Sequence, residues 1–279
     1  MADITATMVK ELRDETGLGM MECKRALQDA NGDKQQAIRL LRERGLAIAG
    51  KKSSRVAKDG RVAADIYDGG QAGVLLEVNC ETDFVAKNEV FQAFVKALLE
   101  KARGVESGAL AEAVKDQVAA KIAEIGENIV VRRNERFVVA GPGAVAGYIH
   151  LGGKVGVLLE VGCGRPETAA LPVFKEAVKD VTLHIAACNP VCLDRTAVPA
   201  ETVTAEREIY AKQAENKPAA IIQKIVDGKL EKYYQQICLL EQGFVKDPDQ
   251  TVKEFLAARG RDLGDTLVIR RFARFQVGV

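Results

Sequence analysis

The sequence predicts an α+β protein, and three observations support this class. Helical sequence opens the chain, a strand–turn–strand–helix pattern then occurs twice, and a second helical stretch interrupts the later copy. We therefore expect an N-terminal three-helix module, a core of two repeated α+β subdomains with antiparallel strands, and an inserted antiparallel coiled-coil hairpin.

The three-helix module is predicted over residues 1–50. Met8, Val9 and Leu12 recur at helical spacing in a first helix that ends at a glycine. The Asn-Gly pair after the second helix stops it, and the aspartate that follows can cap a third. We expect Gly45 to end this third helix.

An internal repeat follows a polar, basic segment at 51–59 that is typical of a linker. Residues 60–80, GRVAADIYDGGQAGVLLEVNC, match residues 143–163, GAVAGYIHLGGKVGVLLEVGC, at 13 of 21 positions with no gap and an offset of 83. Each copy predicts a strand, a Gly-Gly turn, a buried strand and then a helix. We assign one core subdomain to 60–140 and the other to 141–279.

The second copy contains an insertion. Residues 125–133 resemble residues 263–271 at an offset of 138, so the second copy holds 55 residues (138 − 83) that the first copy lacks. Apolar residues recur at near-heptad spacing on both sides of Pro218, which breaks the helix. We therefore predict a coiled-coil hairpin over about 199–240.

Composition argues against several classes of protein. Forty Lys and Arg residues against 39 Asp and Glu leave a net charge of +1, so no overall basic field attracts nucleic acid. No apolar run approaches the roughly 20 residues that cross a bilayer. Six scattered cysteines fit reduced thiols in a cytosol. We expect a cytoplasmic protein with no membrane partner, and nucleic acid is not expected as a partner.

No motif predicts catalysis. The sequence lacks a phosphate-binding loop and has only two histidines. His184, Cys188 and Cys192 have a spacing that could place metal ligands on one helix face, but Asn189-Pro190 interrupts that helix, and buried thiols are the better reading. We predict that the protein is not an enzyme and that it has no cofactor and no metal.

The segment after the first buried strand, Cys80-Glu81-Thr82-Asp83-Phe84, points to a partner. One alternative is that Thr82 or Asp83 caps a helix while Phe84 turns into the core. The second copy has Gly164-Arg165-Pro166-Glu167 there, although its strands match closely. The fold therefore does not require an Asp-Phe pair, and an acid and an aromatic on such a loop favour partner binding.

These residues also carry a family resemblance. The run TDFVAKN at 82–88 resembles the signature loop of the elongation factor Ts family. The segments at 9–24 and 30–33 are similar to that family, as are 125–128, Tyr148-x-His150 and Phe244-Val245. The segment before Phe244 departs from it, because the family often has a proline next to this phenylalanine.

The resemblance implies a guanine nucleotide exchange factor for the GTPase elongation factor Tu, with an N-terminal module like ubiquitin-associated domains. It implies no direct nucleotide binding by this chain. It also implies that Asp83 and Phe84 enter the partner near its magnesium and nucleotide site. The other partner-binding positions that it implies are Thr82, Val85, Lys87, Asn88, Leu12, Met20, Met21, Lys24, Ile125, Gly126, His150, Phe244 and Val245.

Plainer roles stay open for some of these positions. Met20 and Met21 could pack inside the three-helix bundle, and Lys24 could be an ordinary solvated charge. His150 could be a structural histidine. The rival functions are an enzyme, a nucleic-acid-binding ribosomal factor and a scaffold for ubiquitin-like partners, and the double core with its near-neutral charge fits none of them well.

Overall fold

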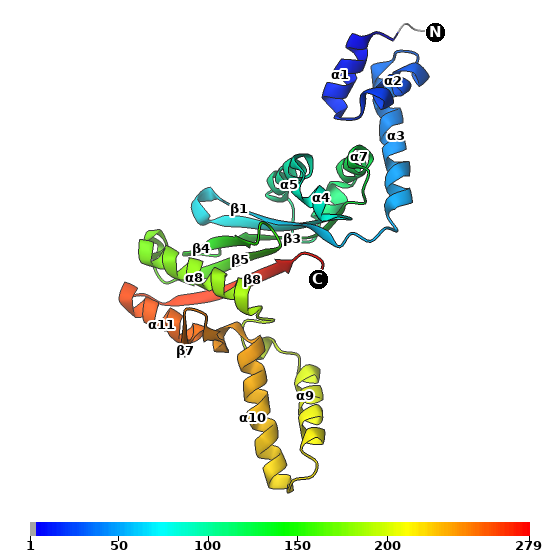
Figure 1. The fold of residues 1–279 in the computed structure, drawn as a ribbon. Coiled ribbons are helices and arrows are strands. Elements are labelled where there is room, and N and C mark those ends of the chain that lie inside the picture. Colours follow the sequence, from blue (N-terminus) through cyan, green and yellow to red (C-terminus); the bar gives the residue numbers. More distant parts are fainter. Residues whose placement is uncertain (1–3) are drawn as a thin grey trace.

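The computed structural model describes residues 4–279, and its α+β class confirms the predicted one. A helical module lies at the N-terminal end, two sheets lie in the middle, and a helical hairpin projects from the opposite side of the sheets (Figure 1).

Three helices enclose a small apolar core in the N-terminal module. They are α1 (Ala6–Thr16), α2 (Met20–Asp29) and α3 (Lys34–Lys52). The hydroxyl of Thr5 accepts a hydrogen bond from the N–H of Met8 at the start of α1, and the side chain of Asp33 caps α3 in the same way. The buried residues of this core are Val9, Leu12, Leu18, Cys23, Ala26, Leu27, Ala30, Ala37 and Leu41.

The third helix is longer than predicted, so the prediction that Gly45 ends it is wrong. The helix continues to Lys52 and includes the start of the predicted linker. Gly45 is buried against α7 (Lys115–Ile125), where an added Cβ would lie 3.8 Å from the carbonyl oxygen of Ala119. Gly45 therefore lies at a contact between two helices and does not end one.

The first repeat forms a three-stranded antiparallel sheet with helices on one face. The strand order is β1 (Asp59–Tyr67), β2 (Ala72–Cys80), β3 (Val130–Val138). The helices are α4 (Asp83–Lys87), α5 (Glu89–Ala102), α6 (Leu110–Ala113) and α7. Every residue of β2 is buried, and side chains such as Val74 and Leu76 pack in one cluster with Phe91 of α5.

The second repeat forms an equivalent sheet of β4 (Gly143–His150), β5 (Val155–Cys163) and β8 (Leu267–Gln276). Its helices are α8 (Pro172–Cys188) and α11 (Val252–Leu263), and a short hairpin joins β6 (Gly243–Phe244) to β7 (Asp247–Thr251). The central strands β2 and β5 shift register at the equivalent positions Glu77/Val78 and Glu160/Val161. The repeat therefore extends to the irregularities of the sheet.

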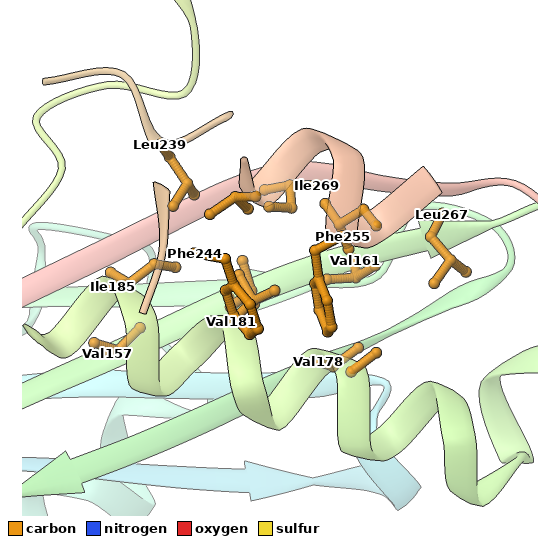
Figure 2. Packing of buried hydrophobic residues seen from close by; sticks show 14 of the residues in the cluster. Val157, Val161, Val178, Val181, Ile185, Leu239, Phe244, Phe255, Leu267 and Ile269 are labelled. Carbon is orange, nitrogen blue, oxygen red and sulfur yellow. The ribbon is translucent and has the colours of Figure 1, made fainter. Parts of the chain in front are cut away.

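The core of the second half lies between its sheet, α8 and α11 (Figure 2). Val181 and Ile185 of α8 belong to the same cluster as Val157 of β5. Phe244 stacks on Phe255 of α11 with ring centroids 4.1 Å apart.

The two sheets pack face to face, with their helices on the outer sides. Side chains from both sheets form one buried cluster: Val62, Leu75, Phe137, Val145, Leu158 and Phe275. The interface also holds the buried carboxylates of Glu77 and Glu160, which accept hydrogen bonds from the equivalent arginines Arg133 and Arg271 at 2.7 Å. Pairing with arginine offsets the cost of burying these charges.

Close approach of the sheets requires glycine at position 156, and we expect Gly156→Ala to destabilise the chain by about 1–3 kcal/mol. An added Cβ would lie 2.3 Å from Cγ1 of the buried Val62. Denaturant unfolding followed by circular dichroism measures the change. The control is Gly228→Ala, where a Cβ in a helix meets nothing within 4 Å. Equal stability of the Gly156 variant and the parent would contradict this packing argument.

The insertion forms an antiparallel pair of helices, α9 (Ala200–Gln213) and α10 (Ala219–Ile237). Val226 and Leu230 are buried along the stripe that faces α9. Arg195 at the base forms ion pairs with Glu231 and Glu241. The chain after α10 returns at once to the core, because Leu239 is fully buried there. In the part of the chain that the structure describes, no helix has the length and apolar character needed to cross a bilayer.

Candidate functional site

The loop after β2 runs into the first turn of α4, where it presents an exposed aromatic side chain. Thr82 caps α4, because its hydroxyl accepts a hydrogen bond from the N–H of Val85 at 3.4 Å. The next residues are Asp83 and Phe84, and Phe84 is 82% exposed. Thr82 therefore takes the role that the capping alternative gave it, but Phe84 does not turn into the core.

A single carboxylate anchors this loop. Oε2 of Glu127 accepts hydrogen bonds from the N–H groups of Glu81 (3.0 Å) and Thr82 (3.1 Å), and Oε1 accepts one from the Thr82 hydroxyl (2.7 Å). In return, Glu81 accepts a hydrogen bond from the N–H of Asn128 at 2.7 Å. Two loops 46 residues apart thus hold each other, which fixes the backbone that carries Phe84.

The second repeat keeps the anchor but not the aromatic. Asp265, the equivalent of Glu127, accepts hydrogen bonds from the N–H groups of Gly164 and Arg165 and from the hydroxyl of Thr168. These bonds, that from Thr168 above all, lower the pKa of Asp265 to about 2. A short 3-10 turn over Pro166–Ala170 stands in place of α4. The anchor thus belongs to the fold, whereas the Asp-Phe pair is an addition to it.

Asp83 is paired within its own helix turn. Its carboxylate lies 2.7 Å from the ammonium of Lys87, and this hydrogen bond lowers the pKa of Asp83 and raises that of Lys87. The charge of Lys154 on the β4–β5 turn lowers the pKa of Asp83 further. Asp83 therefore stays ionised, and it lies within the electrostatic range of the second repeat.

Lys154 also lines a surface hollow of about 730 Å³. Two of the predicted partner-binding positions line the same hollow. Its lining includes His150, at the end of β4, and Val245, which follows the inserted hairpin. His150 is exposed, and its Nδ1 lies 2.9 Å from the hydroxyl of Tyr148. These two predicted residues, 95 positions apart in the chain (245 − 150), line one site.

Three residues of this region were missed from the sequence: Glu127, Leu151 and Lys154. Leu151 lines the hollow, is 70% exposed and has a left-handed backbone (φ 49°), which a leucine adopts only at a cost. The first repeat has Asp68 and Gln71 at the positions of Leu151 and Lys154. The comparison of repeats that singled out Phe84 could therefore have found these two as well.

The other loop residues are distributed around α4. Val85 is half-buried, whereas Lys87 and Asn88 are exposed. The side chain of Asn88 accepts a hydrogen bond from the N–H of Val90 and so caps α5. Ile125 is half-buried at the end of α7, and Gly126 ends that helix with φ 86°. They are the two residues before Glu127, and so they lie near the anchored loop.

The N-terminal module exposes two of its predicted contacts. Met20 is 51% exposed and Met21 is 62% exposed at the start of α2, so neither packs inside the bundle. Lys24 is also exposed. Leu12 and Phe244, in contrast, are 0% and 2% exposed because they fill the cores of the module and of the second half. In the free chain these two side chains are therefore not accessible for direct contact with a partner.

His184 holds the segment of Phe244 and Val245. Its Nδ1 accepts a hydrogen bond from the N–H of Val245 at 3.1 Å, and its Nε2 lies 2.9 Å from the side-chain oxygen of Gln242. This pattern requires the neutral ring with its proton on Nε2. Burial lowers the pKa of His184 below its ordinary value.

Acid is therefore expected to destabilise this segment. The unfolded chain binds a proton on His184 below about pH 6.5, whereas the folded chain binds it only at lower pH. The stabilising contribution is complete above about pH 6.5 and falls on acidification. We expect the melting temperature to drop between pH 7.5 and 5.5, and His184→Gln to flatten that dependence. Parallel pH profiles for variant and parent would contradict this role.

Within residues 4–279 the structure brings together no group of three or more His, Cys, Asp and Glu side chains that could hold a metal ion. Cys188 lies beside His184, with Sγ 3.6 Å from Nδ1.

Comparison with known proteins gives consistent matches. A family model described as "Elongation factor TS" matches residues 81–279. A relative from Nitratiruptor sp., named "Elongation factor Ts", is 43% identical over 290 residues, covering 99% of this chain and 93% of the relative. Relatives of the same name from Trichlorobacter lovleyi and Symbiobacterium thermophilum are 44% and 45% identical, covering 99% and 100% of this chain and 93% of each relative.

Proposed function

Because the chain belongs to the elongation factor Ts family, we propose that it binds elongation factor Tu and promotes release of GDP during translation elongation. In this role the chain acts as an exchange factor in the cytoplasm and catalyses no chemical reaction of its own. The observation that carries the finer proposal is Phe84, which is 82% exposed on a loop fixed by Glu127.

An exposed aromatic on a rigid loop has a specific use. Exposing Phe84 to water costs free energy that the fold does not recover, whereas burial in a partner recovers it. The loop is held by hydrogen bonds to Glu127, so little conformational entropy is lost when Phe84 binds. We propose that Phe84 inserts between side chains of the GTPase near its magnesium and nucleotide site.

Asp83 adds a negative charge next to Phe84. A GTPase holds GDP through backbone amides, a lysine and Mg²⁺. Asp83 is ionised in the free chain, where its partner is Lys87. We propose that Asp83 disturbs the water shell of the bound Mg²⁺ and so weakens the hold on GDP, with Thr82, Val85, Lys87 and Asn88 forming the rest of this contact.

Thermodynamics requires a wide interface. A factor that favours the nucleotide-free GTPase weakens GDP binding by the same ratio by which GDP weakens the factor. A ten-thousandfold change needs about 5.5 kcal/mol of differential binding, more than one phenylalanine supplies. We propose that other residues, each at least partly exposed, share it: Met20, Met21, Lys24, Ile125, Gly126, His150, Val245, Leu151 and Lys154.

We further propose a division of the chain into a helical module (1–50), a linker (51–59) and two core subdomains (60–140 and 141–279), with the coiled-coil insertion at about 199–240. The elements of the structure cross two of these bounds, because α3 continues to Lys52 and β1 begins at Asp59. Neither a cofactor nor direct nucleotide binding by this chain is part of the proposed exchange reaction.

A nucleotide-release assay tests the proposed function. Elongation factor Tu is loaded with a fluorescent GDP, mixed with this chain and excess unlabelled GDP, and followed by stopped-flow fluorescence. We expect substoichiometric amounts of the chain to accelerate release, and we expect Asp83→Ala/Phe84→Ala to abolish that acceleration while binding persists. Binding without acceleration by the parent chain would overturn the exchange mechanism, and absence of binding would overturn the partner.

A further inference from the structure

Two thiols lie in contact at the base of the helical hairpin. Sγ of Cys192, which follows α8, lies 3.6 Å from Sγ of Cys238, the residue after α10. Their backbones form an isolated parallel β-bridge, in which the N–H of Cys192 donates to the carbonyl of Ile237 and the N–H of Leu239 donates to the carbonyl of Cys192. Bridged strands lie about 5 Å apart, within the Cα separation that a disulfide spans.

The other cysteines of the described chain are arranged differently. Cys80 and Cys163 end the equivalent strands β2 and β5, and each thiol donates to a backbone carbonyl two residues later. Cys188 lies against the ring of His184. Across residues 4–279, Cys192 and Cys238 are the pair whose sulfur atoms lie within contact distance.

We propose that Cys192 and Cys238 form a reversible disulfide that closes the base of the hairpin when a peroxide is present. Cys192 is partly exposed, so the peroxide oxidises its thiol to a sulfenic acid and leaves as water. The sulfur of Cys238 then attacks the sulfenic sulfur, the S–S bond forms, and a second water leaves with the thiol proton. A dithiol reductant restores both thiols by exchange.

The burial of the two thiols determines which one is oxidised first and how fast the disulfide then forms. Cys238 is fully buried, and burial raises its pKa to about 12. Its thiolate is therefore scarce near neutral pH, and the second step is slow. The partly exposed Cys192 is the one that oxidant reaches, while Cys238 resolves the intermediate from 3.6 Å away.

The bond would join the two chain segments that connect the hairpin to the core. In the reduced chain these segments are held by the short bridge and by the ion pairs of Arg195 with Glu231 and Glu241. Arg195 and both acids are at least partly exposed, so water screens these pairs. A covalent link would restrain the base far more strongly than they do.

Mass spectrometry and hydrogen exchange on the full-length chain test the proposal. We expect hydrogen peroxide to remove two hydrogens and two of the six thiols, with a Cys192–Cys238 cross-linked peptide after digestion. We expect amide exchange of Leu239 and Leu240 to slow by about tenfold or more, since opening of the base is restrained. Dithiothreitol should reverse both changes. None of these readouts depends on the proposed function.

Two variants set the controls. Cys192→Ser should abolish the cross-link and leave exchange unchanged by peroxide, and this position is partly exposed, so the variant is expected to fold. Cys188→Ser should form the cross-link as the parent does. A bond between Cys188 and Cys192, a bond between two chains, or a cross-link that leaves amide exchange unchanged would each overturn the proposal.

Discussion

Phe84→Ala is expected to slow the stimulated release of GDP from elongation factor Tu by roughly 30-fold, the effect of losing about 2 kcal/mol at an interface hot spot. Phe84 is 82% exposed, so its removal takes little from the fold. We expect the free energy of unfolding to change by less than about 0.5 kcal/mol. Stopped-flow release and denaturant unfolding on the same samples measure the two effects separately.

The control for this substitution is another exposed apolar residue. Val191 is 73% exposed and lies after α8, outside the proposed contact. Val191→Ala should leave GDP release unchanged. If GDP leaves elongation factor Tu as fast with Phe84→Ala as with the parent chain, Phe84 has no part in the mechanism. If Phe84→Ala unfolds more readily than the parent, its rate reports on folding and not on contact.

Glu127→Ala is expected to slow GDP release by about tenfold although Glu127 need not touch the partner. The substitution removes an acceptor from two backbone N–H groups and one hydroxyl, all in the loop that carries Phe84. The loop then samples several conformations, and binding must order it again. We expect a lower melting temperature together with the slower release, which stopped-flow fluorescence measures.

The second repeat supplies a matched control, Asp265→Ala. Asp265 makes the equivalent hydrogen bonds to Gly164, Arg165 and Thr168, but its loop carries no exposed aromatic. Both variants should lose stability, and only Glu127→Ala should lose exchange activity below its melting transition. Equal loss of activity in both variants would show that the effect comes from general destabilisation.

The sequence was most informative where a pattern repeats within the chain. Both strand–turn–strand units could be predicted, because the alternation and the Gly-Gly turns are local properties of the chain. The exposure of Phe84 could also be predicted, since the second copy lacks it while keeping the same strands. For these features no knowledge of distant contacts was needed.

Other features depend on contacts that sequence spacing does not reveal. Gly45 was predicted to end a helix, but it packs against Ala119 of α7, more than 70 residues later in the chain. In the sequence Glu127 is only part of a turn motif. Its hydrogen bonds to the loop at Glu81 depend on the fold, which brings the two segments together. The family resemblance implied partner contacts for Leu12 and Phe244, and both side chains lie in hydrophobic cores. Each case turns on tertiary packing, which overrides local pattern.

The narrow base of the inserted hairpin has a mechanical consequence. α10 has 19 residues and is therefore roughly 28 Å long. Its two helices pack on each other and are joined to the core at one end only, so a small rotation at the base displaces the tip by a larger distance. A tilt of about 10° at Cys192 and Cys238 moves the tip by about 5 Å, given that length. Small changes in side-chain packing at the base are thereby amplified along the hairpin, so the base determines where the tip lies relative to the two sheets.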